Sequence, residues 1–259
     1  MKLRVIYKDN HYKKGECNMK KVFALLLALT MLVAFAGCNA EEKLPEGVMT
    51  YAEFAAAAMD TEVTVHTYVQ AVESWWDGHV QIYAQSRDGA YYIYNYACTE
   101  EEAAKLVPGT KIEVKGYKGE WSGEVEIMDA TIKILEGSYI ATEALDVTAL
   151  MGTDALAEKM NMKVAVKGMT VEASKDNDGN DVPFLYKWDG SGSQGDDIYF
   201  KVSVNGNTYT FTVNAYMIGN DAAYKAVEDL KIGDKIDVEG FLYWYNGAQP
   251  HVTNVAPAK

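Results

Sequence analysis

Two stretches of this 259-residue chain read LVPGTKIEVKGYKGEWSG (residues 106–123) and LKIGDKIDVEGFLYWYNG (residues 230–247). They align without gaps at an offset of 124, and seven of the 18 positions are identical, three of them glycines. Further upstream, VTV at 63–65 matches VAV at 164–166 at an offset of 101, so the second copy carries 23 additional residues. A repeat of this kind predicts that one structural plan is used twice.

Each copy predicts five strands, with a short helix between the third and the fourth. Asp88-Gly89 and Asn205-Gly206, each between alternating apolar runs, are typical of hairpin turns. Thr99 and Glu102 have the spacing of a helix capping box. The expected strands are 62–73, 79–85, 90–97, 111–118 and 124–135 in the first copy, and 162–172, 198–204, 209–216, 235–245 and 251–255 in the second.

Three strands, a helix and two strands is the element order of an OB-fold, a five-stranded Greek-key barrel. The pattern resembles OB-fold domains of bacterial surface lipoproteins over most of 60–136 and 160–257. We therefore expect a mainly β protein with two tandem five-stranded OB-fold-like barrels. Each barrel should have a short helix between strands 3 and 4 and a preceding helix.

The N-terminal region predicts export. Residues 19–37 combine two lysines, an apolar run of 14 residues and a small Ala-Gly pair, which is typical of a secretory signal. The run is short for a transmembrane helix, which needs about 20 residues. With Cys38 after Ala-Gly, the segment resembles a bacterial lipoprotein signal, although Phe35 stands where leucine is usual. The resemblance implies lipidation of Cys38 and anchoring to the outer face of a bacterial membrane.

The remaining boundaries follow from these two patterns. Residues 1–18 precede the signal awkwardly, and we interpret them as a mis-called start with translation beginning at Met19. The charged segment 38–49 is expected to be a tether. The first OB-like domain is then 50–137, and the second is 138–259 with a long loop at 174–197. Capping residues Thr50 and Glu53 predict the first preceding helix, and Val147 to Met160 the second.

Composition bounds the class of function. The apolar fraction is 49% and the charged fraction 24%, which fits ordinary globular domains, and three cysteines exclude a disulfide-dense scaffold. After residue 37 the histidines are His66, His79 and His251, and the chain contains neither HExxH nor GxSxG. We therefore expect a binding or interaction module, without enzymatic activity and without a required cofactor.

A ligand groove is predicted on the first barrel. OB-folds usually bind on the outer face of strands two and three, between the loops that follow strands one and four. Because side chains alternate across a strand, tyrosines and glutamines should face outward there, and tryptophans should lie in the flanking loops. The predicted ligand-binding residues are Tyr83, Tyr92, Tyr94, Tyr96, Trp75, Trp76, Trp121, Gln81 and Gln85. The competing interpretation is that these tyrosines pack against the neighbouring barrel or the preceding helix.

Aromatic rings of this kind stack on nucleic-acid bases or on sugar rings. Net charge is −13, and removal of residues 1–37 takes away seven basic and two acidic side chains and leaves −18. Because polyanion binding draws its affinity from Lys and Arg, charge disfavours nucleic acid and favours a neutral glycan or a peptide. Two alternatives remain open: a structural subunit of a surface assembly, with a protein partner covering the rings, and single-stranded nucleic-acid binding.

The second copy carries different side chains. Its aromatic residues lie in the insertion and on strand four, which predicts a spacer or a second site of different chemistry; they are Tyr186, Trp188, Tyr243, Trp244 and Tyr245. In the insertion, Ser174 to Gly179 resembles the start of an EF-hand loop, but Ser174 replaces the first acidic ligand and Leu185 stands in place of the closing glutamate. A calcium site at Asp176, Asp178 and Asp181 competes with the interpretation that these are solvated turns.

Overall fold

The computed structural model describes residues 44–259, which form one compact unit. The predicted mis-called start, the signal, Cys38 and the first part of the tether lie outside the described residues, so these predictions stay predictions. In the part of the chain that the structure describes, no helix is both long enough and apolar enough to cross a membrane.

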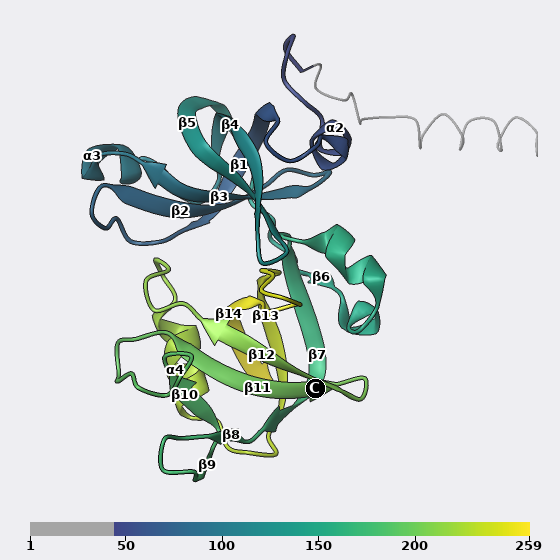
Figure 1. Ribbon diagram of the computed structural model, residues 1–259, viewed down its shortest axis with the longest axis vertical. Coiled ribbons are helices and arrows are strands. Elements are labelled where there is room, and N and C mark those ends of the chain that lie inside the picture. The colour runs from purple at the N-terminus through teal and green to yellow at the C-terminus, as the bar shows by residue number, and fades with distance from the viewer. Residues whose placement is uncertain (1–43) are drawn as a thin grey trace, which may run out of the picture. The chain divides into compact units, whose positions relative to one another are not determined.

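The first half is a closed five-stranded barrel with the strand order β1-β2-β3-β5-β4 (Figure 1). Strands β3 and β5 run parallel, and the other neighbours are antiparallel. The elements are α2 (Tyr51–Ala56), β1 (Glu62–Val72), β2 (His79–Gln85), β3 (Ala90–Ala97), α3 (Glu100–Ala103), β4 (Thr110–Trp121) and β5 (Glu124–Ser138). The predicted mainly β fold with an OB-like barrel is thereby confirmed.

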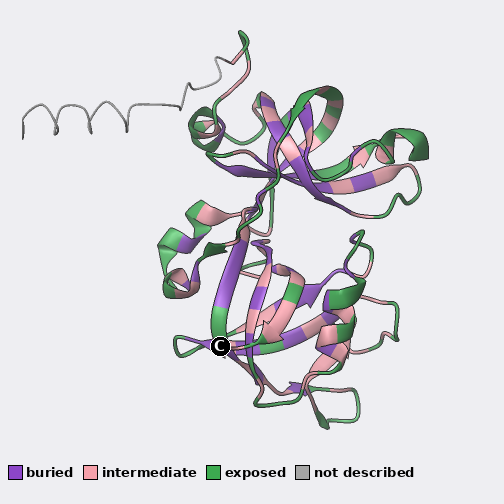
Figure 2. Ribbon diagram, turned by 180° about the vertical axis from the view of Figure 1, so that it is seen from behind, coloured by how far each residue is buried: buried purple, intermediate pink, exposed green. Residues whose placement is uncertain are grey.

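Local sequence signals place both helices of this half. Thr50 caps α2 and Thr99 caps α3, and in each case the glutamate three residues later, Glu53 or Glu102, completes the capping box. The barrel core is formed by the inward-facing apolar side chains of all five strands together with Phe54 of α2. Along most of β1 buried positions alternate with intermediate ones, as the period of a half-buried strand requires, and Figure 2 shows such buried and intermediate bands on the strands.

The second half is a seven-stranded sheet with the order β10-β11-β12-β14-β13-β7-β6, in which β11 also pairs with β7. As in the first half, the third and fifth strands of the shared plan, here β12 and β14, run parallel. The elements are β6 (Leu145–Asp146), η1 (Thr148–Leu150), η2 (Asp154–Lys159), β7 (Lys163–Glu172), β8 (Ser174–Lys175), β9 (Asp181–Val182), β10 (Phe184–Tyr186), β11 (Ile198–Val204), β12 (Asn207–Val213), α4 (Asp221–Glu228), β13 (Lys235–Phe241) and β14 (His251–Pro257). Tandem OB domains, as a description of the whole chain, stay a prediction.

Two local predictions are corrected, and the start of α4 is described with them. The expected helix over 147–160 is two short 3-10 segments, because Gly152 between them has φ of +87° and cannot continue a right-handed helix. The predicted long loop contains β8, β9 and β10, which pair locally or add to the sheet edge. Asn220 does not cap α4 with its side chain, which donates instead to the carbonyl oxygens of Asn214 and Val252.

The two halves are joined through an aromatic cluster, which we call the junction and which consists of Ala71, Tyr83, Tyr92, Met217 and Phe241. The Tyr83 ring stacks on Phe241 with 4.5 Å between centroids and 9° between planes. Its hydroxyl also lies 2.9 Å from Nδ1 of His251. Around this cluster the backbone N–H of Ser74 donates to the carbonyl of Tyr216. The outer face of β2 is therefore covered by the second half of the same chain.

Replacing Phe241 by alanine should lower the free energy of unfolding by about 3 kcal/mol, because it opens a cavity under Tyr83 in a fully packed cluster. Urea unfolding followed by circular dichroism measures the change. Phe241→Leu is the control, since it keeps most of the volume and should cost about 1 kcal/mol. A loss below about 1 kcal/mol for the alanine variant would show that the junction does not hold the halves together.

Candidate functional site

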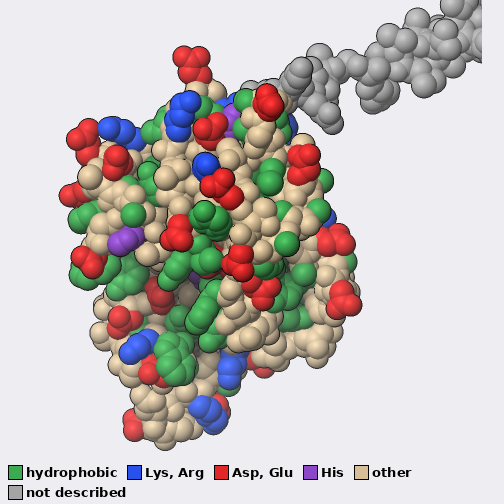
Figure 3. All heavy atoms as spheres, turned by 45° about the horizontal axis from the view of Figure 1, so that its top comes forward, with side chains coloured by type: hydrophobic (Ala, Val, Ile, Leu, Met, Phe, Trp, Pro, Cys, Tyr) green, Lys and Arg blue, Asp and Glu red, His purple; other side chains and the backbone are tan. Residues whose placement is uncertain are grey.

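An open groove of about 790 Å³ lies beside the junction and draws on both halves of the chain. We call it the aromatic groove. Its exposed rings are Trp121 at 61%, Trp188 at 70%, Tyr216 at 55% and Tyr245 at 49% exposure. The groove is lined by Glu73, Gln81, Tyr92, Trp121, Ser174, Lys175, Leu185, Trp188, Asp197, Tyr199, Lys201, Thr210, Thr212, Asn214, Tyr216, Tyr243, Tyr245, Gln249 and His251. On one face of the molecule hydrophobic side chains gather around a central hollow, with acidic side chains beside it (Figure 3).

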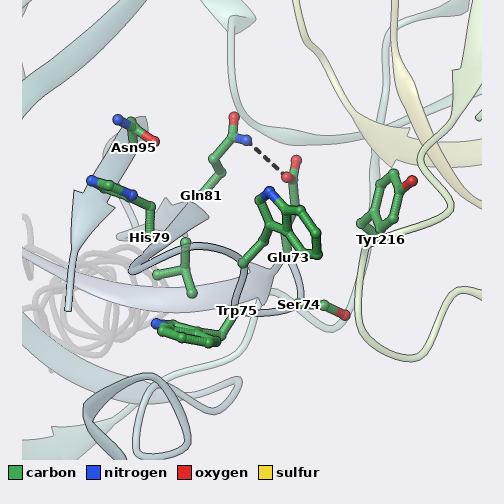
Figure 4. A pocket seen from close by; sticks show the side chains of 9 residues that line it. Glu73, Ser74, Trp75, His79, Gln81, Asn95 and Tyr216 are labelled. Carbon is green, nitrogen blue, oxygen red and sulfur yellow. Dashed lines mark hydrogen bonds between the residues drawn. The ribbon is translucent and has the colours of Figure 1, made fainter. Parts of the chain in front are cut away.

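A second cavity of about 460 Å³, the side pocket, shares Glu73, Gln81 and Tyr216 with the aromatic groove. Its other walls are Ser74, Trp75, Trp76, His79, Val80 and Asn95. The indole of Trp75 is held in place because its Nε1 donates to the Cys98 carbonyl at 2.8 Å, whereas Trp76 is 82% exposed. Figure 4 shows Glu73 and Gln81 pointing toward one another between Trp75 and Tyr216.

Two carboxyl groups lie on the shared wall and the adjacent groove. Glu73 accepts hydrogen bonds from Gln81 Nε2 at 2.9 Å and from Asn214 Nδ2 at 2.7 Å. Burial raises the pKa of Glu73 to about 7, the nearby Asp197 carboxylate adds to the rise, and the hydrogen bond from Asn214 opposes it. Burial also raises the pKa of Asp197, whose carboxylate accepts a hydrogen bond from the backbone N–H of Ala215. Near neutral pH, Glu73 is thus poised between its two protonation states.

The inner wall of the groove is a stack of rings. His251 stacks on Tyr243 at 4.4 Å, and Tyr243 meets the edge of Tyr92 at 5.5 Å. Burial lowers the pKa of His251 to about 4, so its imidazole is neutral in the folded protein at pH 7. The hydroxyl of Tyr92 donates to Oε1 of Gln81, which fixes the side chain that also bonds Glu73. This wall is therefore rigid and uncharged.

The structure brings only part of the predicted ligand set to a surface. Trp75, Trp76 and Gln81 line the side pocket, and Trp121 lines the aromatic groove. The predicted exposure of Tyr83 and Gln85 is wrong: they face away from the barrel core as expected, but the second half covers them. Gln85 is buried and its Oε1 accepts from the backbone N–H of Lys163 at 2.8 Å. For these side chains the packing interpretation holds.

Tyr92 is also buried, at 3% exposure, although it lines part of the aromatic groove. The predicted orientation of Tyr96 is wrong for another reason. Between paired positions β3 carries one more residue than β2, and Asn95 absorbs it with φ of +49°. The bulge reverses the alternation, so Tyr96 packs against the barrel core. Tyr94 is 44% exposed but lines neither cavity.

Sequence reasoning missed that residues of the second half complete the groove. The sequence predicts that Trp188, Tyr243 and Tyr245 belong to a spacer or to a second site, yet they line the same cavity as Trp121 of the first half. Tyr199 was overlooked, although its alternation with buried Ile198 already indicated an outward-facing ring. No local pattern in the sequence connected the two halves at this point.

Two of the three aspartates of the proposed calcium loop, Asp176 and Asp181, have their side chains engaged within the loop itself. Asp176 accepts hydrogen bonds from the backbone N–H groups of Asp178 and Asn180, and Asp181 pairs with Lys175 at 2.8 Å. Among residues 44–259 no group of three or more His, Cys, Asp or Glu side chains is arranged to hold a metal ion. The geometry favours the solvated-turn interpretation of this loop.

No protein-family model matches the chain, and no curated protein matches it. Among solved structures, a murine DNA-binding protein bound with double-stranded DNA is 12% identical with a TM-score of 0.34, covering 76% of this chain and 98% of that one. The Ifi202 HINa domain in complex with 20-base-pair double-stranded DNA is 16% identical, TM-score 0.32, covering 78% and 98%. A replication protein A heterotrimer bound to single-stranded DNA is 8% identical, TM-score 0.27, covering 86% and 72%.

These structures overturn one prediction. Net negative charge led us to disfavour nucleic acid as a partner, but the solved structures similar to this chain include proteins bound to double-stranded and to single-stranded DNA. The prediction that charge disfavours a nucleic-acid partner is therefore withdrawn.

Glu124 directly follows the turn after Trp121 and connects this turn to Trp244 of the second half. The turn is tight, with Ser122 at φ of +51° and Gly123 at +91°, and the ring of Trp244 lies where a side chain at Gly123 would project. Glu124 is fully buried, and its Oε2 accepts from the backbone N–H of Trp244 at 2.7 Å. Burial raises the pKa of Glu124 to about 8, against the opposing hydrogen bonds from Asn161 and Trp244.

Because the folded-state pKa of Glu124 lies above its unfolded value, its contribution to stability is complete below about pH 4.5 and is lost as pH rises through about 8. Glu124→Gln should therefore raise the free energy of unfolding by about 2 kcal/mol at pH 9 and change it little at pH 5. Denaturant unfolding at both pH values measures this. Glu120→Gln, at an exposed position of the same hairpin, should be neutral at both; an equal effect of the two variants would contradict the assignment.

Proposed function

We propose that this chain is a binding module, not an enzyme, whose ligand lies in the aromatic groove and stacks its rings on Trp121 and Trp188. The observation that carries this proposal is that two large indoles, 61% and 70% exposed, line one cavity. A volume of about 790 Å³ lies within the usual range of ligand sites.

Ring stacking is chemistry that nucleic-acid bases and sugar rings share. The groove also offers hydrogen-bonding groups that would orient a stacked ring, among them the amides of Asn214 and Gln249. The alternative of a structural subunit lacks this support, because the second half of the chain itself covers the buried tyrosines that such a partner would have covered.

The location proposed for this activity is the outer face of a membrane, with Cys38 as the lipid attachment point. Residues 19–38 alone support it, through their signal-like order of charge, apolar run and cysteine. A diacylated cysteine would hold the protein firmly, because two acyl chains suffice for stable anchoring.

Trp121→Ala and Trp188→Ala should each weaken ligand binding about tenfold or more, because one stacked ring contributes about 1–3 kcal/mol. A glycan array and a panel of single-stranded oligonucleotides, probed first with the wild-type protein and then with the variants, measure this. Tyr117→Ala is the control, since it removes an exposed ring that lines neither cavity. Binding that both tryptophan variants leave unchanged would place the ligand elsewhere.

Cys38→Ser should release the protein from the membrane when the chain is expressed in a bacterial host that lipidates such signals. Detergent phase partitioning and incorporation of labelled fatty acid measure the change. Cys98→Ser, a substitution of the free cysteine within the barrel half, should leave partitioning as in the wild type. Equal partitioning of wild type and Cys38→Ser would contradict anchoring.

A further inference from the structure

We propose that the acidic end of the aromatic groove, formed by Glu73 and Asp197 beside Tyr216, binds the ammonium group of a ring-bearing amine. The inference rests on the proposed function of the groove and adds the chemical class of the ligand. Its starting point is that two acidic side chains from different halves of the chain line the same cavity.

Within residues 44–259 neither carboxylate has a cationic partner. The partners of Glu73 are the neutral amides of Gln81 and Asn214, and Asp197 accepts from a backbone N–H. Within residues 44–259 neither forms an ion pair, although seven such pairs occur elsewhere in that range. A buried carboxylate without a cation is costly, and an ammonium group from a ligand would offset that cost.

The surrounding groups suit an organic cation. Tyr216 lines both cavities next to Glu73 and is 55% exposed, so its ring face is available for a cation–π contact. The hydroxyl of Thr212, on the groove face of β12, is buried at 2% exposure and has no hydrogen-bond partner. A donor on the ligand, such as an ammonium N–H, would satisfy that oxygen.

The positive groups of the groove lie toward its other end. Asp197 directly precedes β11, and Tyr199 and Lys201 follow at every second position, so the Cα atom of Lys201 lies roughly 13 Å along the extended chain from that of Asp197. Lys175 is already paired with Asp181. His79 also lines the side pocket, and its Nδ1 lies 2.9 Å from the Asp77 carbonyl. The groove thus has an acidic end, flanked by aromatic rings, that is distinct from the end with the lysines.

The protonation state of Glu73 supplies an independent readout. Because its pKa is raised to about 7, part of the population is neutral at pH 6, and a cation should bind only the ionised form tightly. The other groups facing Glu73 are the carboxylate of Asp197 and the phenols of Tyr83, Tyr92 and Tyr243, none of which adds positive charge. Affinity for an amine should therefore rise between pH 5.5 and pH 8.

The test uses calorimetric titration of the full-length protein with tryptamine, and with tryptophol as its neutral counterpart carrying the same ring. We expect tryptamine to bind at least tenfold more tightly than tryptophol at pH 8. Glu73→Gln and Asp197→Asn should each remove most of that difference. Glu136→Gln, which makes the same change of charge at an exposed position outside both cavities, should retain it.

The outcomes separate this inference from the proposed function. Equal binding of tryptamine and tryptophol, lost in Trp188→Ala, would overturn the amine inference and leave the groove as a ring-binding site. No binding of tryptamine would also overturn it, whatever the glycan and oligonucleotide screens find. If Glu73→Gln fails to fold by circular dichroism, the wild-type pH profile decides: a flat affinity for tryptamine between pH 5.5 and pH 8 overturns the inference.

Discussion

The stacking of Tyr83 on Phe241 is the contact on which the arrangement of the site depends. It joins the outer face of β2 to the C-terminal end of β13. A hydrogen bond between the Tyr83 hydroxyl and Nδ1 of His251 completes the contact. Buried aromatic pairs contribute through both area and ring geometry. Because this contact holds the two halves as one unit, a surface that would be open in an isolated barrel is interior here.

That covering moves the candidate site. In a single OB-type barrel the exposed face of strands two and three is where a ligand would usually lie. Here the second half occupies the place of that ligand against Tyr83 and Gln85, and the remaining opening is the groove at the edge of the junction. Trp75, in the loop after β1, and Trp121, at the end of β4, still line the two cavities.

The packing of the two halves against each other also explains the raised pKa values of two carboxyl groups. Glu73 and Glu124 both lie where the halves meet, and in both burial is the largest cause of a raised pKa. The two differ in access: Glu124 is sealed under the turn that carries Trp121, whereas Glu73 borders both cavities. One carboxyl group therefore affects mainly stability, and the other is available to a ligand.

The sequence by itself determined the five main strands of each half, two capping boxes and the order of these elements, because they depend on neighbouring residues and on a period of two. It also identified Trp75, Trp76, Trp121 and Gln81 as cavity residues. Only the tertiary structure decided that Tyr96 turns inward at the Asn95 bulge and that Tyr83 is covered by Phe241. A bulge inserts one extra residue into a strand, and the alternation of apolar and polar residues does not reveal where. A contact between side chains 158 positions apart is set by packing in space, which local sequence does not encode.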